Sequence, residues 1–159
     1  MALPCILFPS TVTSSASVIL MPSVAEMQAL GHRKKIRYIT RTTCTACILL
    51  GSLCTTVFYF GGNFAGTILF HNTDAGLYIR TLSFICPFLY TNIALTSILN
   101  GLGKTGTTLV HSVLGILLRI SFVIFAIPVL GIRGYLYGLL LSEILLSLLH
   151  IYALYHMEF

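Results

Sequence analysis

The sequence predicts an all-α fold: a polytopic membrane bundle of about five transmembrane helices in a single domain, residues 1–159. Hydrophobic residues make up 57% of the chain and charged residues only 8%, whereas a soluble domain carries roughly 25% charged residues. Apolar runs of about 20 residues, the length that crosses a bilayer, follow one another along the chain. The charges that do occur are concentrated in one basic segment between two of these runs.

Five stretches are long and apolar enough to span a membrane: 3–24, 43–60, 77–99, 107–129 and 134–155. The first is the most polar, because serine and threonine fill it between Pro9 and Pro22. Hydroxyls in a membrane helix bond backbone carbonyls or a neighbouring helix. Prolines beside a dense hydroxyl stripe also suit a bent helix that lines a wet cavity. Both interpretations of this span stay open.

Lysine and arginine predict the orientation. The connection 25–42, interrupted by Gly31, holds five of the nine Lys and Arg residues, and the connection 100–106 holds Lys104. If the spans alternate in direction, these six lie on one side and Arg80 and Arg133 on the other. The positive-inside rule then places 25–42 in the cytoplasm. We therefore expect a multi-pass protein of the bacterial cell membrane, with its first residues outside and its last residues inside.

Patterns that carry catalysis or ligand binding are absent from the sequence. The four acidic residues are not paired closely enough for a two-carboxylate mechanism. The stretch Gly101–Thr105 ends like a phosphate-binding loop, but Ile98 stands where the first glycine should be. Cys44 and Cys47 have the spacing of half a zinc site, without a second half. The net charge of +5 is not interleaved with exposed aromatic residues, as a nucleic-acid surface would be. We expect no enzyme, no metal, no cofactor and no nucleic-acid partner.

Two charged residues lie inside predicted spans, where charge is costly and normally faces a partner or a cavity. Arg119 stands twelve residues before Gly131, the predicted turn between the last two spans, and Glu143 stands twelve residues after it. An antiparallel hairpin brings both to the same depth. His111 and His150, twenty residues before and nineteen after Gly131, match in the same way. Either the four form a structural ion pair and a histidine pair, or they form a polar track along a substrate path.

The span 77–99 contributes further polar candidates. Asn92 follows Pro87 by five residues, where a proline kink frees a carbonyl group, and Asn100 lies at the end of the span. Hydrogen bonding between helices is the plainer interpretation of both asparagines. Arg80, near the outer end, is able to reach lipid headgroups with its long side chain.

Several stretches resemble a known family in order and spacing. Pro9 and the run Pro22–Glu26, followed by the basic segment, resemble the proline-rich helix and exit of the stage V sporulation protein B and polysaccharide-biosynthesis family. Cys86–Tyr90 with Ser97–Lys104 resembles that family's next-but-one helix, and Gly131–Gly138 resembles the turn into the following one. The family belongs to the multidrug/oligosaccharidyl-lipid/polysaccharide exporter superfamily.

The resemblance implies a lipid-linked oligosaccharide flippase with two pseudo-symmetric lobes of six helices, working by alternating access. The chain would form most of the second lobe, and a separate N-terminal lobe would be its partner, together with membrane lipids and a lipid-linked saccharide substrate. The implied activity is translocation of a cell-wall precursor, such as a peptidoglycan or polysaccharide precursor, with no bond made or broken. The alternatives are an ion-coupled multidrug antiporter of the same superfamily, and a truncated remnant that does not transport.

Overall fold

A computed structural model describes residues 10–70 and 81–156, and every element it describes there is helical. Sequence composition explains this outcome, because in lipid each backbone polar group must be bonded within its own segment, and helices achieve that. In chain order the elements are α2 (Ser10–Ala29), α3 (Arg33–Phe70), the short 3₁₀ helix η1 (Ser83–Ile85), α5 (Cys86–Gly101), α6 (Thr105–Phe125), α7 (Ile127–Leu130) and α8 (Ile132–His156).

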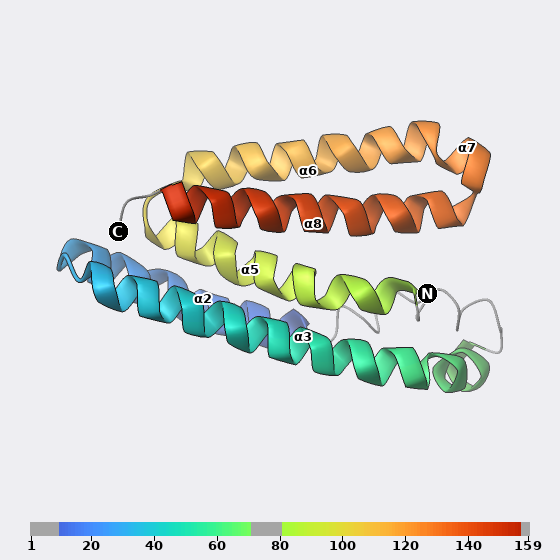
Figure 1. Ribbon diagram of the computed structural model, residues 1–159, viewed down its shortest axis with the longest axis horizontal. Helices are drawn as coiled ribbons and strands as arrows, with labels where there is room; N and C mark the ends of the chain where they lie inside the picture. Colours follow the sequence, from blue (N-terminus) through green and yellow to red (C-terminus); the bar gives the residue numbers. More distant parts are fainter. Residues whose placement is uncertain (1–9, 71–80, 157–159) are drawn as a thin grey trace.

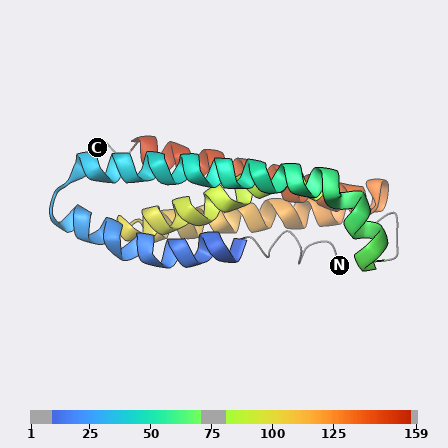
Figure 2. The ribbon, with the colours of Figure 1, turned by 90° about the horizontal axis from the view of Figure 1, so that it is seen from below.

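Helix α5 is the centre of the bundle (Figure 1). It packs against α2 and α3 on one side and against α8 on the other, while α6 packs mainly on α8. Figure 2 shows that α2 and α3 form one antiparallel hairpin, and in Figure 1 α6 and α8, joined through α7, form a second one beside α5. The central position of α5 agrees with its composition: its residues from Cys86 to Gly101 are all buried or half-buried, and most of them are apolar.

Four helical segments in the described part of the chain are long and apolar enough to cross a membrane: Arg33–Gly61, Ser83–Gly101, Thr105–Phe125 and Gly134–His156. They correspond to the last four predicted spans, and the all-helical membrane bundle is therefore confirmed. The span predicted at 3–24 is not among them. Its described part lies in α2, which is a regular helix but is diluted by hydroxyl residues, and residues 3–9 lie outside the described ranges.

The helix boundaries differ from the expected spans at two places. Helix α3 begins at Arg33 and continues to Phe70, so it takes in residues assigned to the connections on both sides of the span 43–60. The span 107–129 is divided at Ala126 into α6 and α7. Pro128, near the start of α7, has no N–H to donate to the preceding turn, which explains the break.

The connection between α2 and α3 is a tight turn. Gly31 adopts a φ of +70°, a left-handed conformation that favours glycine at the end of a helix. The N–H of His32 bonds the carbonyl of Met27 at 2.9 Å, and the N–H of Gly31 bonds that of Gln28 at 3.1 Å. This arrangement satisfies the last carbonyls of α2. The predicted connection 25–42 thus shrinks to three residues, and its five Lys and Arg residues lie on the first three turns of α3.

The turn before α3, the turn before α6 and the end of α8 all lie at one end of the bundle, on the left in Figure 1. The six Lys and Arg residues that we expect in the cytoplasm are on or beside these segments: Arg33, Lys34, Lys35, Arg37, Arg41 and Lys104. The alternation of the spans therefore brings them together. We call this the basic end; its cytoplasmic position stays a prediction.

Close backbone contacts hold the helices together. A Cβ atom added to Gly51 of α3 would overlap the backbone of Pro87 in α5, and one added to Gly101 of α5 would lie 2.6 Å from the carbonyl oxygen of Met21 in α2. Small residues allow such approaches, which supply the van der Waals contact that replaces hydrophobic driving force in lipid.

Candidate functional site

An ion pair joins the two helices of the second hairpin. Arg119 of α6 and Glu143 of α8 form a salt bridge between a guanidinium nitrogen, Nη2, and the carboxylate oxygen Oε1. The Glu143 side chain is only 8% exposed, whereas that of Arg119 is 35% exposed. The pairing predicted from matched depth on either side of Gly131 is therefore present in the structure.

Two residues from neighbouring positions complete this cluster. The Nε of Arg119 donates to the hydroxyl of Ser142 at 2.9 Å, and that hydroxyl donates to the carbonyl of Leu139 at 2.8 Å. From α5, the amide nitrogen of Asn92 donates to Glu143 Oε2 at 2.7 Å and to the Glu143 carbonyl oxygen at 2.9 Å. Three helices thus meet at one carboxylate, and both of its oxygens accept a bond. We call Asn92, Arg119, Ser142 and Glu143 the polar cluster.

The two predicted histidines also meet. The ring centroids of His111 and His150 lie 5.0 Å apart with an angle of 61° between the ring planes. Both residues are buried, His111 at 8% and His150 at 2% relative exposure. We call them the histidine pair. It lies on the same seam between α6 and α8 as the polar cluster, nearer to the basic end.

The other sequence candidates are placed as follows. Asn100 accepts a hydrogen bond from the hydroxyl of Thr108 at 2.7 Å, which ties the end of α5 to the start of α6. Arg80 lies outside the described residues. In the part of the chain that the structure describes, no three His, Cys, Asp or Glu residues lie close enough to hold a metal ion.

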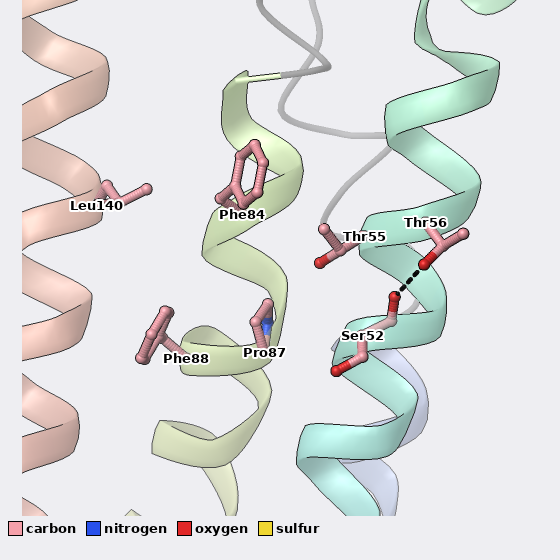
Figure 3. A pocket seen from close by; sticks show the side chains of 7 residues that line it. All are labelled: Ser52, Thr55, Thr56, Phe84, Pro87, Phe88 and Leu140. Atoms are coloured by element: carbon pink, nitrogen blue, oxygen red, sulfur yellow. Dashed lines mark hydrogen bonds between the residues drawn. The ribbon is translucent and has the colours of Figure 1, made fainter.

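A groove of about 540 Å³ runs between α3 and α8 with α5 as its floor (Figure 3). Its lining residues are Ser52, Thr55, Thr56, Phe84, Pro87, Phe88 and Leu140. The three hydroxyls on α3 are all used by backbone carbonyls: Ser52 donates to Ile48 at 2.7 Å, Thr55 to Gly51 at 2.9 Å and Ser83 at 2.8 Å, and Thr56 to Ser52 at 2.9 Å. The groove therefore suits an apolar group rather than a sugar or a phosphate.

The polar cluster lies close to the groove along two helices. Asn92 is one turn from Phe88 along α5, and Glu143 is three residues from Leu140 along α8. Both polar residues are nevertheless buried, at 6% relative exposure each. The carboxylate is held by its partners and is not a lining residue of the groove.

Helix α2 separates its hydroxyl residues into two faces. Ser10, Thr13 and Ser17 are buried at a helical spacing, which places them on the side that packs against α5. Thr11, Ser14 and Ser15 are exposed, and the Ser15 hydroxyl donates to the Thr11 carbonyl at 2.8 Å. Both interpretations of the serine-rich span therefore remain open. The buried hydroxyl face packs against a neighbouring helix, and the exposed hydroxyl face is available to lipid or to a cavity.

Sequence reasoning missed Ser142. Its position directly before Glu143 could have indicated it, because an arginine that binds a carboxylate with one nitrogen can place its Nε beside the preceding residue of the same helix. It also treated Asn92 and Glu143 as separate candidates. Nothing in their spacing along the chain indicated the contact, because their helices are not adjacent in sequence.

The chain is similar to a curated protein along most of its length. The chain is 22% identical to "Stage V sporulation protein B" of Bacillus subtilis (strain 168) over 151 residues, which is 94% of this chain and 29% of that protein. The chain thus spans less than a third of the length of the relative. No protein-family profile matches the chain, and no solved structure matches it.

Proposed function

We propose that the chain is part of a membrane transporter that translocates a lipid-linked cell-wall or polysaccharide precursor across the bacterial cell membrane by alternating access. The observation that carries the proposal is the similarity to stage V sporulation protein B along 94% of the chain, in a bundle with four helices able to cross a membrane. In this proposal the chain supplies helices of the second lobe, and the rest of the cavity comes from an N-terminal lobe.

The structure offers features that suit this role. The groove between α3 and α8 is lined by apolar groups and by hydroxyls whose protons are already bonded, so it suits the hydrocarbon part of a lipid-linked substrate. The exposed hydroxyl face of α2 suits the side of a wet cavity. The polar cluster ties α5, α6 and α8 into one body, which is what a lobe that moves as a unit requires.

An ion-coupled multidrug antiporter is the rival proposal, with Glu143 as its coupling carboxylate. Such a role needs an acid that is free to take up and release a cation. Glu143 instead accepts bonds at both carboxylate oxygens, from Arg119 and from Asn92. Uptake of a cation there would have to break this network, so the polar cluster favours a structural role for the acid and, with it, the flippase proposal.

A segment exchange tests the proposal. The matching 151 residues of the Bacillus subtilis protein are replaced by this chain, and the chimera is produced in a strain that lacks the natural protein. We expect the chimera to restore sporulation and, in vesicles, to move a fluorescent lipid-linked oligosaccharide between leaflets. We expect no such movement by this chain alone, because α2 and the groove then face lipid.

The matched control is the natural protein with the same segment deleted, which should do neither. Membrane insertion of the chimera is measured in parallel by fluorescence-detected size exclusion. A chimera that inserts as a single species yet moves no lipid would contradict the proposal and favour a remnant without transport. Drug-dependent proton or sodium flux, with no lipid movement, would favour the antiporter.

A further inference from the structure

Buried nitrogen atoms without a partner set the histidine pair apart from the other polar residues of the bundle. Among the described residues, His111 Nδ1 and both ring nitrogens of His150 have no hydrogen-bond partner. A neutral imidazole carries one donor and one acceptor, and leaving such groups buried and unbonded costs free energy. A buried site of this kind requires a reason other than packing.

The position of the pair gives it access to protons. His111 is the seventh residue of α6, and His150 is the seventh from the end of α8. At 1.5 Å per residue both lie about 9 Å from the basic end of the bundle. Imidazole is the side chain whose charge changes most readily near neutral pH, so the ring nitrogens of the pair are the groups at this depth that a proton arriving from that side can bind.

We propose that His111 and His150 together form a proton-binding site between α6 and α8. One proton from water binds a free ring nitrogen of His150. The resulting N–H then donates to the free Nδ1 of His111, so that the pair carries a single positive charge shared by two rings. Only a proton moves, and no electrons are exchanged. The rings turn to align donor and acceptor, and this changes the contact between the two helices at the basic end.

The other titratable groups on the surrounding helices are paired, distant or exposed, which leaves the two histidines as the proton-binding groups. On the seam, Glu143 lies seven residues before His150 and Arg119 eight residues after His111, and these two neutralise each other. Helix α5, which packs on both helices, carries only Cys86 and Tyr90 as titratable groups, and both belong to the core around Leu136 at the other end. Helices η1 and α7 carry none. At the basic end, Lys104, Tyr152, Tyr155, His156 and the five Lys and Arg residues of α3 are all exposed.

A metal ion fits the pair less well than a proton does. Zinc is normally held by three or four protein ligands, and the described residues provide no third His, Cys, Asp or Glu at this point. Two imidazoles sharing one proton need no third protein ligand to hold that proton, because the N–H of one ring has the neutral ring of the other as its acceptor.

The test is imidazole NMR on the full chain, labelled with ¹⁵N-histidine in lipid nanodiscs, from pH 4 to pH 8.5. We expect the signals of His111 and His150 to move together as one proton is taken up. In H111Q or H150Q, the remaining imidazole loses its partner, and its proton affinity should fall at least tenfold. The matched control is H156Q, an exposed histidine on α8, which should leave the pair unchanged.

Three results would overturn the proposal. The two rings titrate independently of each other, or both stay neutral down to pH 4, or one equivalent of Zn²⁺ at pH 7.5 shifts both signals. If a variant does not fold, the NMR coupling between the two rings across the shared proton, measured in the natural sequence, decides whether the proposal holds. Because proton uptake is measured without transport, failure here leaves the flippase proposal to its own test.

Discussion

Removing one partner of the Arg119–Glu143 ion pair leaves the other charge without a counter-ion, so the change should cost more stability than the pair itself contributes. Arg119→Leu leaves a carboxylate that is 8% exposed, and we expect a loss of about 3 kcal/mol, in the range for a charge left at mid-membrane or in a broken buried pair. Glu143→Leu leaves a guanidinium that is 35% exposed. It still has the Ser142 hydroxyl and can reach toward headgroups, so we expect about 2 kcal/mol in total, the bond that Asn92 loses included.

The double change Arg119→Leu with Glu143→Leu removes both charges, so no unpaired ion remains. Asn92 then loses one of its two acceptors, which costs about 1–2 kcal/mol. The double variant should therefore lose about 2 kcal/mol in total, against about 5 kcal/mol if the single losses simply added. The coupling energy is the difference, about 3 kcal/mol, which is at the upper end for residues in contact.

The assay is pulse proteolysis in mixed micelles of a mild detergent and sodium dodecyl sulfate, which gives the free energy of unfolding. The matched control is Leu117→Ala with Leu148→Ala, on the outward faces of the same helices at 55% and 60% exposure. Those two changes should add and cost little. If the double change at the ion pair also costs the sum of its single changes, Arg119 and Glu143 are not coupled and the reasoning fails.

Three further predictions follow from particular contacts. A cysteine at position 34, on the basic end, should resist an impermeant thiol reagent added to intact cells and react after the membrane is opened; ready labelling from outside would reverse the orientation. Gly51→Ala should lower the free energy of unfolding by about 1–3 kcal/mol, because the added Cβ would overlap Pro87. Gly61→Ala on the same helix meets nothing within 4 Å and should raise the free energy of unfolding by up to about 1 kcal/mol. Equal effects of the two changes in pulse proteolysis would contradict the close approach of α3 and α5. Asn92→Asp should cost about 3 kcal/mol, more than Asn92→Ala, because it removes two donors and sets a second carboxylate against Glu143; a milder loss for the acid would mean that Asn92 does not hold Glu143.

The sequence predicted those parts of the fold that depend on local pattern. Apolar runs marked the four membrane-crossing helices, and Gly131 marked the turn of the second hairpin, with a φ of +61°. From that turn, counting residues along two antiparallel helices was enough to pair Arg119 with Glu143 and His111 with His150. Depth in a hairpin is a one-dimensional quantity, so it can be counted along the chain.

The remaining features depend on packing in three dimensions. Asn92 reaches Glu143 only because α5 lies at the centre of the bundle and contacts α8. Along the chain, α6 and α7 separate these two helices. The end of α3 at Phe70 was also missed, because the Gly and Asn residues after Phe60 dilute the apolar signal without preventing a helix. Contacts between helices that are distant in sequence cannot be found by counting residues from a turn.

The glycines of the second hairpin bring α6 and α8 close together along their seam. A Cβ added to Gly134 would lie 2.7 Å from the carbonyl oxygen of Ala126, and one added to Gly138 would press on the side chain of Phe122. These contacts tie α8 closely to the end of α6 near α7, and the polar cluster fixes the middle. Beyond it, toward the basic end, a Cβ added to Gly115 would lie 2.8 Å from the side chain of Leu146, and the histidine pair follows one turn further along α6. The two helices are therefore closely packed on both sides of the polar cluster, and the turn of the two rings in the proposed proton site has to be small enough to fit within that packing.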